Sequence, residues 1–363
     1  MKNLLISLTI VFLSLTIFCA LAPAQKTQSG KDSEVAATYF KVVDLILTGQ
    51  SRKLEKLMDD IANSKAITDD GKRRLEEMYK ELLRIDEALL DRWVSSSPNS
   101  AHPYIVRGKY YLMQAERTIQ KDSQKSTPSQ DAALQLLQKA QADFEKANKL
   151  NPANPASAAA MVAVSMYRGY DKQEMEQWFI KATGTDPFWL DSYRNKLHYL
   201  SPSRQGSDAA ILDFALKCAA SSPAGSSVYS ILFDYFETLN PRQQDIETTG
   251  TIQLNLPDRA TEAFLQTIKR FKADFPYSNI PYYYEARFRF LQSDEIPAEF
   301  ILSKILREEP QNILALEARI TLYMAWKKWP KAKKDIDRLL QISPNSLFAK
   351  ANRDALNRQT QSN

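Results

Sequence analysis

The sequence predicts an all-α protein: a right-handed solenoid of about six helix pairs, with a helical cap at its N-terminal end. Three observations predict this fold. Apolar residues recur at helical spacing through most of the 363-residue chain, a two-helix segment recurs along it, and there are only 9 glycines. Few glycines are expected where helices dominate and where turns are built from Pro, Asn and Ser.

The clearest copy of the repeated segment is Leu314–Ser346. Its apolar residues fall on one face of each of two helices: Leu316, Ile320, Tyr323 and Met324, then Ala332, Ile336, Leu339 and Leu340. Pro330 stands at the junction, where proline suits the first turn of a new helix. Pro344 follows the second helix, which it cannot continue. Such a pair buries its apolar faces only by stacking on a neighbour, so further copies are expected.

Matching exit turns recur along the chain, at Pro98, Pro152, Pro187, Pro223, Pro276, Pro310 and Pro344. The intervals between neighbouring prolines are 54, 35, 36, 53, 34 and 34 residues. A period of about 34 residues is that of the tetratricopeptide repeat, and each long interval holds one period plus about 20 residues. The chain therefore resembles a tetratricopeptide-type solenoid with two insertions.

Residue content supports this resemblance from Trp93 to the C-terminus. Small residues stand where this family packs the two helices of a repeat together: Gly108, Ala140, Ala147, Ala163, Ala182, Ala286 and Ala332. Phe144 and Phe179 supply the large side chains beside them. Tyr199 and Ile320 replace the small residue in their units, and Phe271 and Leu339 replace alanine.

Residues 93–117 carry a second resemblance, to a bacterial exported helical family catalogued only as a domain of unknown function. The matching residues are Trp93, Pro98, Ser100, Gly108 and Tyr110 or Tyr111. This resemblance implies a helical fold and supplies no activity.

The N-terminal 24 residues resemble a secretory signal peptide. Lys2 is followed by the apolar stretch Leu4–Leu21, and Ala22-Pro23-Ala24 offers a cleavage site before Gln25. We expect a periplasmic or secreted protein with no stable membrane insertion after cleavage. An uncleaved anchor is the alternative, because the apolar stretch could almost span a bilayer.

Six further segments are expected after the signal peptide. They are a disordered linker (25–32), an N-terminal helical cap (33–97), the solenoid (98–358) with insertions at 119–131 and 240–258, and a polar tail (359–363). In the cap we expect a helix from Ser33, a second over about residues 51–63, and a long third from Thr68 to Trp93. In the second insertion, the alternation of Thr251–Leu256 is compatible with a short strand or a lid.

Several classes of function are disfavoured by the composition. The two histidines, His102 and His198, cannot form a histidine-rich metal site, and no Cys-x-x-Cys or H-E-x-x-H motif is present. Cys218 is the one cysteine after the signal peptide, and it occupies a small-residue core position. A net charge of +5 is low for a nucleic-acid binder. We therefore expect no metal, no cofactor, no nucleic acid and no enzymatic activity.

In the tetratricopeptide family, ligands lie in a concave groove lined by the first helix of each pair. Transferring those positions through the proline spacing selects seven candidate ligand-binding residues: Lys109, Tyr167, Arg168, Tyr193, Lys196, Tyr283 and Arg287. Basic groups and tyrosine rings together suit an extended peptide that carries carboxylates. They also suit a glycan, and the same residues are compatible with an ordinary amphipathic surface.

Two classes of function follow. The leading hypothesis is an exported, non-catalytic repeat protein that binds a protein or peptide in its groove. The alternatives are a cell-wall or glycan-binding protein and, behind it, a hydrolase.

Overall fold

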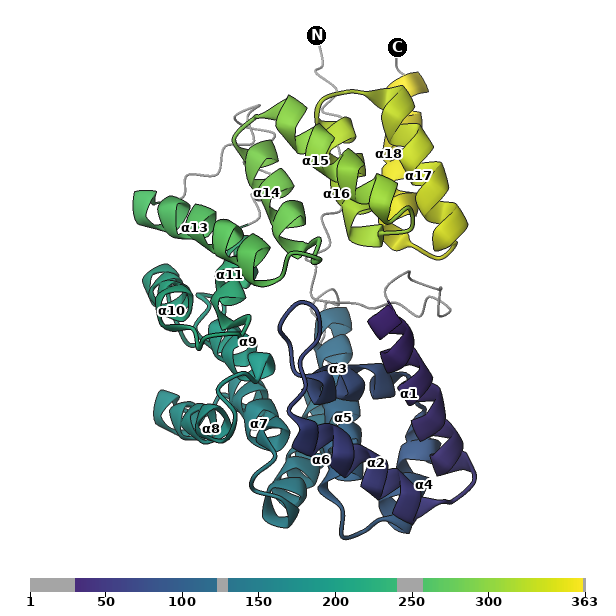
Figure 1. The fold of residues 1–363 in the computed structure, drawn as a ribbon, viewed down its shortest axis with the longest axis vertical. Helices are drawn as coiled ribbons and strands as arrows, with labels where there is room; N and C mark the ends of the chain where they lie inside the picture. The colour runs from purple at the N-terminus through teal and green to yellow at the C-terminus, as the bar shows by residue number, and fades with distance from the viewer. Residues whose placement is uncertain (1–29, 123–129, 240–256, 362–363) are drawn as a thin grey trace. The chain divides into compact units, whose positions relative to one another are not determined.

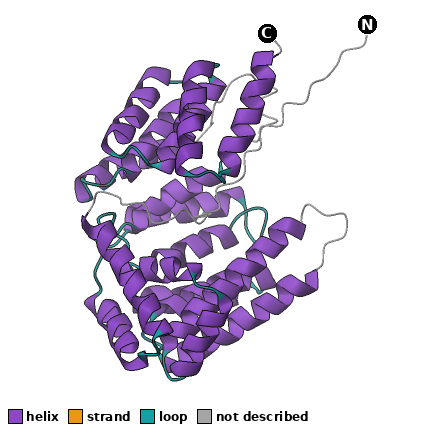
Figure 2. Cartoon of the chain, turned by 90° about the vertical axis from the view of Figure 1, so that its right-hand side faces the viewer, coloured by secondary structure: helices purple, strands orange, loops and turns teal. Residues whose placement is uncertain are grey.

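The computed structural model describes residues 30–122, 130–239 and 257–361, and every regular element in these ranges is a helix (Figure 2). The chain divides into two compact units, which we call the N-terminal unit (Ser29–Tyr235) and the C-terminal unit (from Phe236 onward). The predicted all-α fold built from helix pairs is confirmed (Figure 1).

The N-terminal unit starts with the cap helices and continues with helix pairs. In chain order it contains α1 (Gly30–Leu47), α2 (Ser51–Ser64), α3 (Arg74–Glu81), the 3₁₀ helix η1 (Leu82–Arg84), α4 (Glu87–Ser96), α5 (Ala101–Asp122), α6 (Gln130–Leu150), α7 (Pro155–Arg168), α8 (Lys172–Thr185), α9 (Leu190–Tyr199), α10 (Asp208–Ser221) and the 3₁₀ helix η2 (Val228–Ser230).

Helix α11 (Ile231–Thr238) contains the boundary between the units. The C-terminal unit continues with α13 (Asp258–Asp274), α14 (Ile280–Leu291), α15 (Glu295–Glu308), α16 (Ile313–Ala325), α17 (Trp329–Ile342) and α18 (Leu347–Gln361).

Turns follow the second helices at the predicted prolines. Turns begin at Pro98, Pro152, Pro187, Pro276, Pro310 and Pro344, and the turn after Pro223 falls on the next two residues. Asn154 and Asn312 then cap first helices: their side chains accept the backbone N–H groups of Ala156 and Ala315. An asparagine oxygen satisfies one of the N–H groups that a helix start leaves unpaired, so each exit turn also starts the next pair.

The cap differs from the prediction in two places. Helix α1 begins at Gly30 rather than Ser33, so residues 30–32, expected in the linker, are helical. No residue between the two positions breaks a helix.

The long helix expected from Thr68 to Trp93 is broken into α3, η1 and α4. Residues 68–72 form a turn closed by the antiparallel bridge between Ile67 and Arg73. Ile85 is extended, and the Asp86 carboxylate accepts the N–H of Leu89 at 2.8 Å. Because aspartate competes for backbone N–H groups, this position starts a new helix instead of continuing the old one. The second cap helix, α2, agrees with its prediction.

The insertions and the tail can be compared with the prediction only where the structure describes them. In the first insertion (119–131), residues 119–122 lengthen α5 and residues 130–131 belong to α6, while residues 123–129 lie outside the described residues. Most of the second insertion lies outside them too, including the strand expected at Thr251–Leu256. Helix α18 runs to Gln361, so part of the polar tail expected at 359–363 is helical.

The pairs stack in the order that a repeat requires. In the N-terminal unit α5 packs against α6 and α7, and α7 packs against α8 and α9. In the C-terminal unit α14 packs against α15 and α16, and α16 against α17 and α18. Each first helix thus contacts its own partner and the next first helix, which forms a layer of first helices within each unit.

The small residues lie at these contacts, as predicted. All six alanines are buried: Ala140, Ala147, Ala163, Ala182, Ala286 and Ala332. Gly108 is the tightest position, because a Cβ atom placed there would lie 2.7 Å from the ring of Phe144, which is itself fully buried. Glycine at this position therefore lets α5 approach α6.

Gly108→Ala should destabilise the protein, and Gly184→Ala should not. Both glycines lie in helices, but a Cβ atom at Gly184 meets nothing within 4 Å. Helix propensity favours alanine at both sites by about 1 kcal/mol. At Gly108 overpacking costs about 1–3 kcal/mol, so we expect a net loss there. Urea unfolding followed by circular dichroism measures both; an equal gain at the two sites would refute the close contact with Phe144.

Candidate interaction surface

A buried carboxylate joins the cap to the repeats in the N-terminal unit. Glu76 on α3 is fully buried, and its two oxygens accept the backbone N–H groups of Leu190 and Asp191, each at 3.0 Å. These N–H groups begin α9, whose own N-cap residue, Trp189, makes no side-chain cap. Glu76 therefore caps a helix that lies more than a hundred residues further along the chain.

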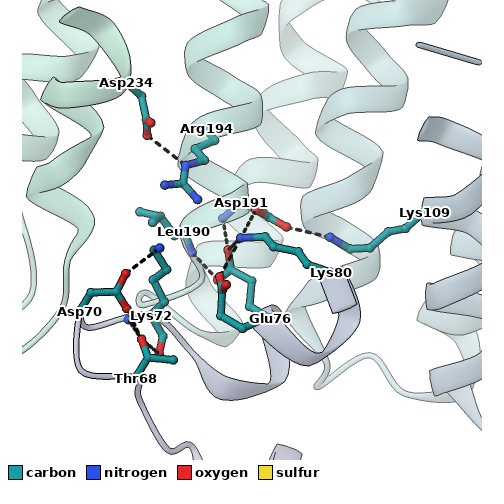
Figure 3. A network of polar contacts seen from close by, with 11 residues as sticks. Thr68, Asp70, Lys72, Glu76, Lys80, Lys109, Leu190, Asp191, Arg194 and Asp234 are labelled. Atoms are coloured by element: carbon teal, nitrogen blue, oxygen red, sulfur yellow. Dashed lines mark hydrogen bonds and ion pairs between the residues drawn. The ribbon is translucent and has the colours of Figure 1, made fainter. Parts of the chain in front are cut away.

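Charged side chains from four helices surround this cap (Figure 3). Lys80 lies 3.5 Å from both Glu76 and Asp191, and Lys109 on α5 is ion-paired with Asp191 at 2.7 Å. Arg194, one turn along α9, pairs with Asp234 on α11 at 3.0 Å. The network thus ties α3 to the first helices of the pairs.

The two acids at the centre of the network titrate in opposite directions. Burial, followed by the neighbouring Asp191 carboxylate, raises the pKa of Glu76 to about 8. Burial alone would raise the pKa of Asp191 as well, but Lys109 and Lys80 outweigh it and hold that pKa well below its usual value. Burial therefore favours the protonated form of Glu76, whereas the two lysines favour the ionised form of Asp191.

Tyr79, also on α3, connects the cap to α5 and α7. The side-chain amide of Asn154 donates to the Tyr79 hydroxyl at 2.8 Å, and that hydroxyl lies 2.7 Å from Nδ1 of His102. Nε2 of His102 lies 3.1 Å from the Asp59 carboxylate. This chain of polar contacts joins α2, α3, α5 and the start of α7.

Arg73, just before α3, makes the third connection. Its guanidinium forms two hydrogen bonds to the Asp186 carboxylate, at 2.8 and 2.9 Å, and lies over the ring of Phe188. Together with Glu76 and Tyr79, it holds the segment 68–80 against the N-terminal ends of three successive first helices, α5, α7 and α9. The cap is thus bound along the first-helix layer as well as at the end of the stack.

The seven predicted ligand-binding residues divide between the units. Five lie in the N-terminal unit: Lys109, Tyr167, Arg168, Tyr193 and Lys196. Only Lys109 joins the network around Glu76.

Tyr193 and Lys196 both contact the second helix α8. Tyr193 packs edge-on against Phe179 and donates to the carbonyl of Pro187. Lys196 is buried, pairs with Glu176 at 2.6 Å and lies over the ring of Phe179. These contacts are internal to the unit.

Tyr167 and Arg168 lie at the end of α7. The Tyr167 ring stacks under Arg204, and its hydroxyl shares a hydrogen bond with Glu116. The half-buried Arg168 guanidinium lies 5.6 Å from the centre of the Tyr170 ring. Binding by these residues stays a prediction.

Tyr283 and Arg287 lie one turn apart on α14 in the C-terminal unit. Arg287 is ion-paired with Glu237 and donates to the Tyr283 hydroxyl at 3.3 Å. The sequence predicts that the Arg287 guanidinium binds a carboxylate of a ligand. In the structure this guanidinium is already paired with a carboxylate of the same unit.

Sequence reasoning missed two residues of these surfaces, Glu76 and Glu317. Glu317 on α16 stands seven residues after Pro310, just as Tyr283 stands seven after Pro276, so the proline spacing could have found it. Burial raises its pKa to about 7. Glu76 has no such local signal, because its function depends on a helix far away in the sequence.

Sites of other kinds are not evident in the described residues. They contain no group of three or more His, Cys, Asp or Glu side chains that could hold a metal ion. Cys218 is buried, and burial raises the pKa of its thiol to about 12, as suits a core residue. Among the described helices, none is both long and apolar enough to cross a membrane.

No family model and no curated protein matches the sequence, so membership of residues 93–117 in the family of unknown function stays a prediction. Among solved structures, the chain is similar to a tetratricopeptide repeat protein from Parabacteroides merdae, with 11% identity and a TM-score of 0.40. That alignment covers 89% of this chain and 98% of the other.

Two further solved structures align with part of the chain. PilW, a widely conserved type IV pilus biogenesis factor, has 15% identity and a TM-score of 0.38, over 67% of this chain and 96% of that one. PilF of Pseudomonas aeruginosa has 14% identity and a TM-score of 0.35, over 67% and 95%. At these values the fold assignment rests on the helix pairs themselves.

Glu76→Gln should remove part of the pH dependence of stability. The pKa of Glu76 is higher in the folded chain, about 8, than the usual 4.5. The folded state therefore binds the extra proton, and its stability falls as pH rises between these values, by at most about 1.4 kcal/mol per pH unit. Glutamine is neutral throughout and should flatten this slope, as measured by urea unfolding at several pH values.

Glu77→Gln is the matched control for this experiment. Burial would raise the pKa of Glu77, but Lys80 and Lys72 together outweigh it and the pKa is lowered. Glu77 is therefore already ionised above pH 4.5, and its replacement should change the slope in that window only slightly, because its charge has the smallest of the effects on the pKa of Glu76. Equal slopes in the wild type and Glu76→Gln would show that Glu76 is ionised in the folded state.

Proposed function

We propose that this chain is an exported, non-catalytic helical-repeat protein that binds a protein or peptide partner along its first helices. One observation carries the proposal: within each unit the first helices pack side by side, α5 with α7, α7 with α9, and α14 with α16. Side chains that recur once per pair can then meet an extended partner at successive points.

The C-terminal unit has the more available first-helix layer. In the N-terminal unit the segment 68–80 is bonded to the starts of α5, α7 and α9, and Lys109 is paired with Asp191. In the C-terminal unit Tyr283 and Glu317 are half-buried on neighbouring first helices. A partner there would meet aromatic and charged groups together, the combination common in protein interfaces.

A glycan is the second candidate, and one surface feature favours it. A shallow depression of about 320 Å³ at the start of α8 is lined by Asp171, Gln173, Glu174, Gln177 and Trp178. Amide and carboxylate groups beside an indole ring can bond to sugar hydroxyls and stack on a sugar face. Pull-down from envelope extracts, compared with binding to purified peptidoglycan, separates the two candidates.

Arg168→Glu tests the peptide hypothesis in the N-terminal unit. The substitution replaces a donor for a partner carboxylate with a repelling charge, so binding should weaken by about 1–3 kcal/mol. Stability should change by less than about 0.5 kcal/mol, because Arg168 is half-buried and lies over a tyrosine ring with no ion pair among the described residues. Titration calorimetry with the captured partner measures the loss; unchanged affinity would remove Arg168 from the site.

Arg287 is unsuitable for the same charge reversal. Arg287→Glu would place two carboxylates together, because Arg287 is paired with Glu237. A loss of binding in that variant would then report folding rather than recognition.

Export predicts a mature chain that begins at Gln25. The basis is the sequence Ala22-Pro23-Ala24 after an apolar stretch. Mass spectrometry of the N-terminus of the protein from its native host would decide the matter: retention of Met1 or a covalently attached lipid would contradict cleavage at this site.

A further inference from the structure

Glu317 differs from the other half-buried or buried acids of the C-terminal unit, because its carboxylate has no partner among the described residues. Within the described residues, no hydrogen bond or ion pair reaches its carboxylate. By contrast, Glu299 accepts from Lys331 at 2.7 Å and from Lys328 at 2.9 Å, and Asp335 forms a two-bond pair with Arg319. Partly buried carboxylates are normally paired in this way, because removing a charge from water is costly.

The surroundings of Glu317 contain a second incompletely paired acid. Burial raises the pKa of Tyr283; Arg287 opposes this effect, and the carboxylates of Glu237 and Glu317 both add to it, which places both acids near the tyrosine. Glu237 is paired with Arg287 through Oε1, while its Oε2 is buried and has no hydrogen-bond partner in the described part of the chain. These four side chains thus contain two carboxylates and one guanidinium, which is paired with Glu237.

This local charge balance favours a cation from outside. The described side chains here sum to one negative charge when both acids are ionised, and Tyr283 offers a ring face and a hydroxyl oxygen beside them. An ammonium or guanidinium group would receive a charge-assisted hydrogen bond from the carboxylate and a cation–π contact from the ring. A divalent metal ion fits less well, since no group of three metal-ligating side chains occurs in the described residues.

We propose that Glu317, with Tyr283 beside it, binds a lysine or arginine side chain of an extended peptide partner on the first helices of the C-terminal unit. The proposal rests on the proposed function and specifies the chemistry of the ligand there. It differs from the sequence-based expectation, in which Tyr283 and Arg287 receive the carboxylates of an acidic peptide. Burial raises the pKa of Glu317 to about 7. A cation that pairs with the carboxylate stabilises its ionised form and so opposes this effect.

The test uses three sets of labelled peptides of equal length and matched apolar content. One set carries Lys and Arg, one carries Asp and Glu, and one carries only neutral polar residues. Binding to the mature full chain is measured by fluorescence anisotropy for the wild type, Glu317→Gln and Glu308→Gln. Glu308 is an exposed acid of the same unit, so Glu308→Gln removes the same charge as a control.

The proposal predicts that basic peptides bind the wild type and Glu308→Gln with equal affinity. Glu317→Gln should weaken this binding about tenfold or more, which corresponds to the loss of one charge-assisted contact. Circular dichroism and thermal unfolding should show that Glu317→Gln is folded. Tyr283→Phe, which keeps the ring, should retain most of the affinity.

Two results overturn the proposal and differ in what they leave standing. If basic peptides bind equally well to Glu317→Gln, or if only acidic or neutral peptides bind, the assignment of Glu317 fails while the peptide-binding function stands. If no peptide set binds the wild type, both fail, and binding of purified peptidoglycan becomes the function to pursue.

Discussion

The N-terminal unit depends on one interaction, the capping of α9 by the buried Glu76 carboxyl group. A helix start in a repeat protein leaves backbone N–H groups unpaired, and α7 satisfies them locally through Asn154. Helix α9 has Trp189 at that position, so its N–H groups bond to α3 instead. A fully buried acid is tolerated because burial raises its pKa to about 8, which favours the uncharged form, while both of its oxygens accept backbone N–H groups.

This arrangement explains why the unit needs the short helices that precede its repeats. Segment 68–80 supplies Arg73, Glu76 and Tyr79, and each bonds to the start of a first helix or to the turn before it. Removing one member of such a network leaves its partner buried and unpaired, which typically costs about 3–5 kcal/mol. The cap is therefore part of the core of the unit, and its polar contacts fix its position along the repeats.

The pairing of charged side chains also differs between the two units. Two ion pairs join first helices of the N-terminal unit to one another: Lys109 with Asp191, and Arg194 with Asp234. In the C-terminal unit the pairing of Arg287 with Glu237 leaves Glu317 without a partner in the described chain. Buried pairs specify structure, whereas a half-buried, unpaired charge is a place where a ligand can contribute the missing interaction.

The sequence alone determined the fold class, the repeat period, the exit turns and the buried positions such as Gly108 and Ala182. These features are encoded locally, in helical spacing, in prolines that end helices and in small residues at helix contacts. Only the tertiary structure decided which charged side chains are paired with one another. Lys109 and Arg287 have the spacing of ligand-binding residues, yet each is paired with a carboxylate far away in sequence. Glu76 in turn gave no sign of its role, because the helix that it caps begins 114 residues later. Helical periodicity identifies which face a side chain occupies, but the partner it meets there is set by the packing of distant helices.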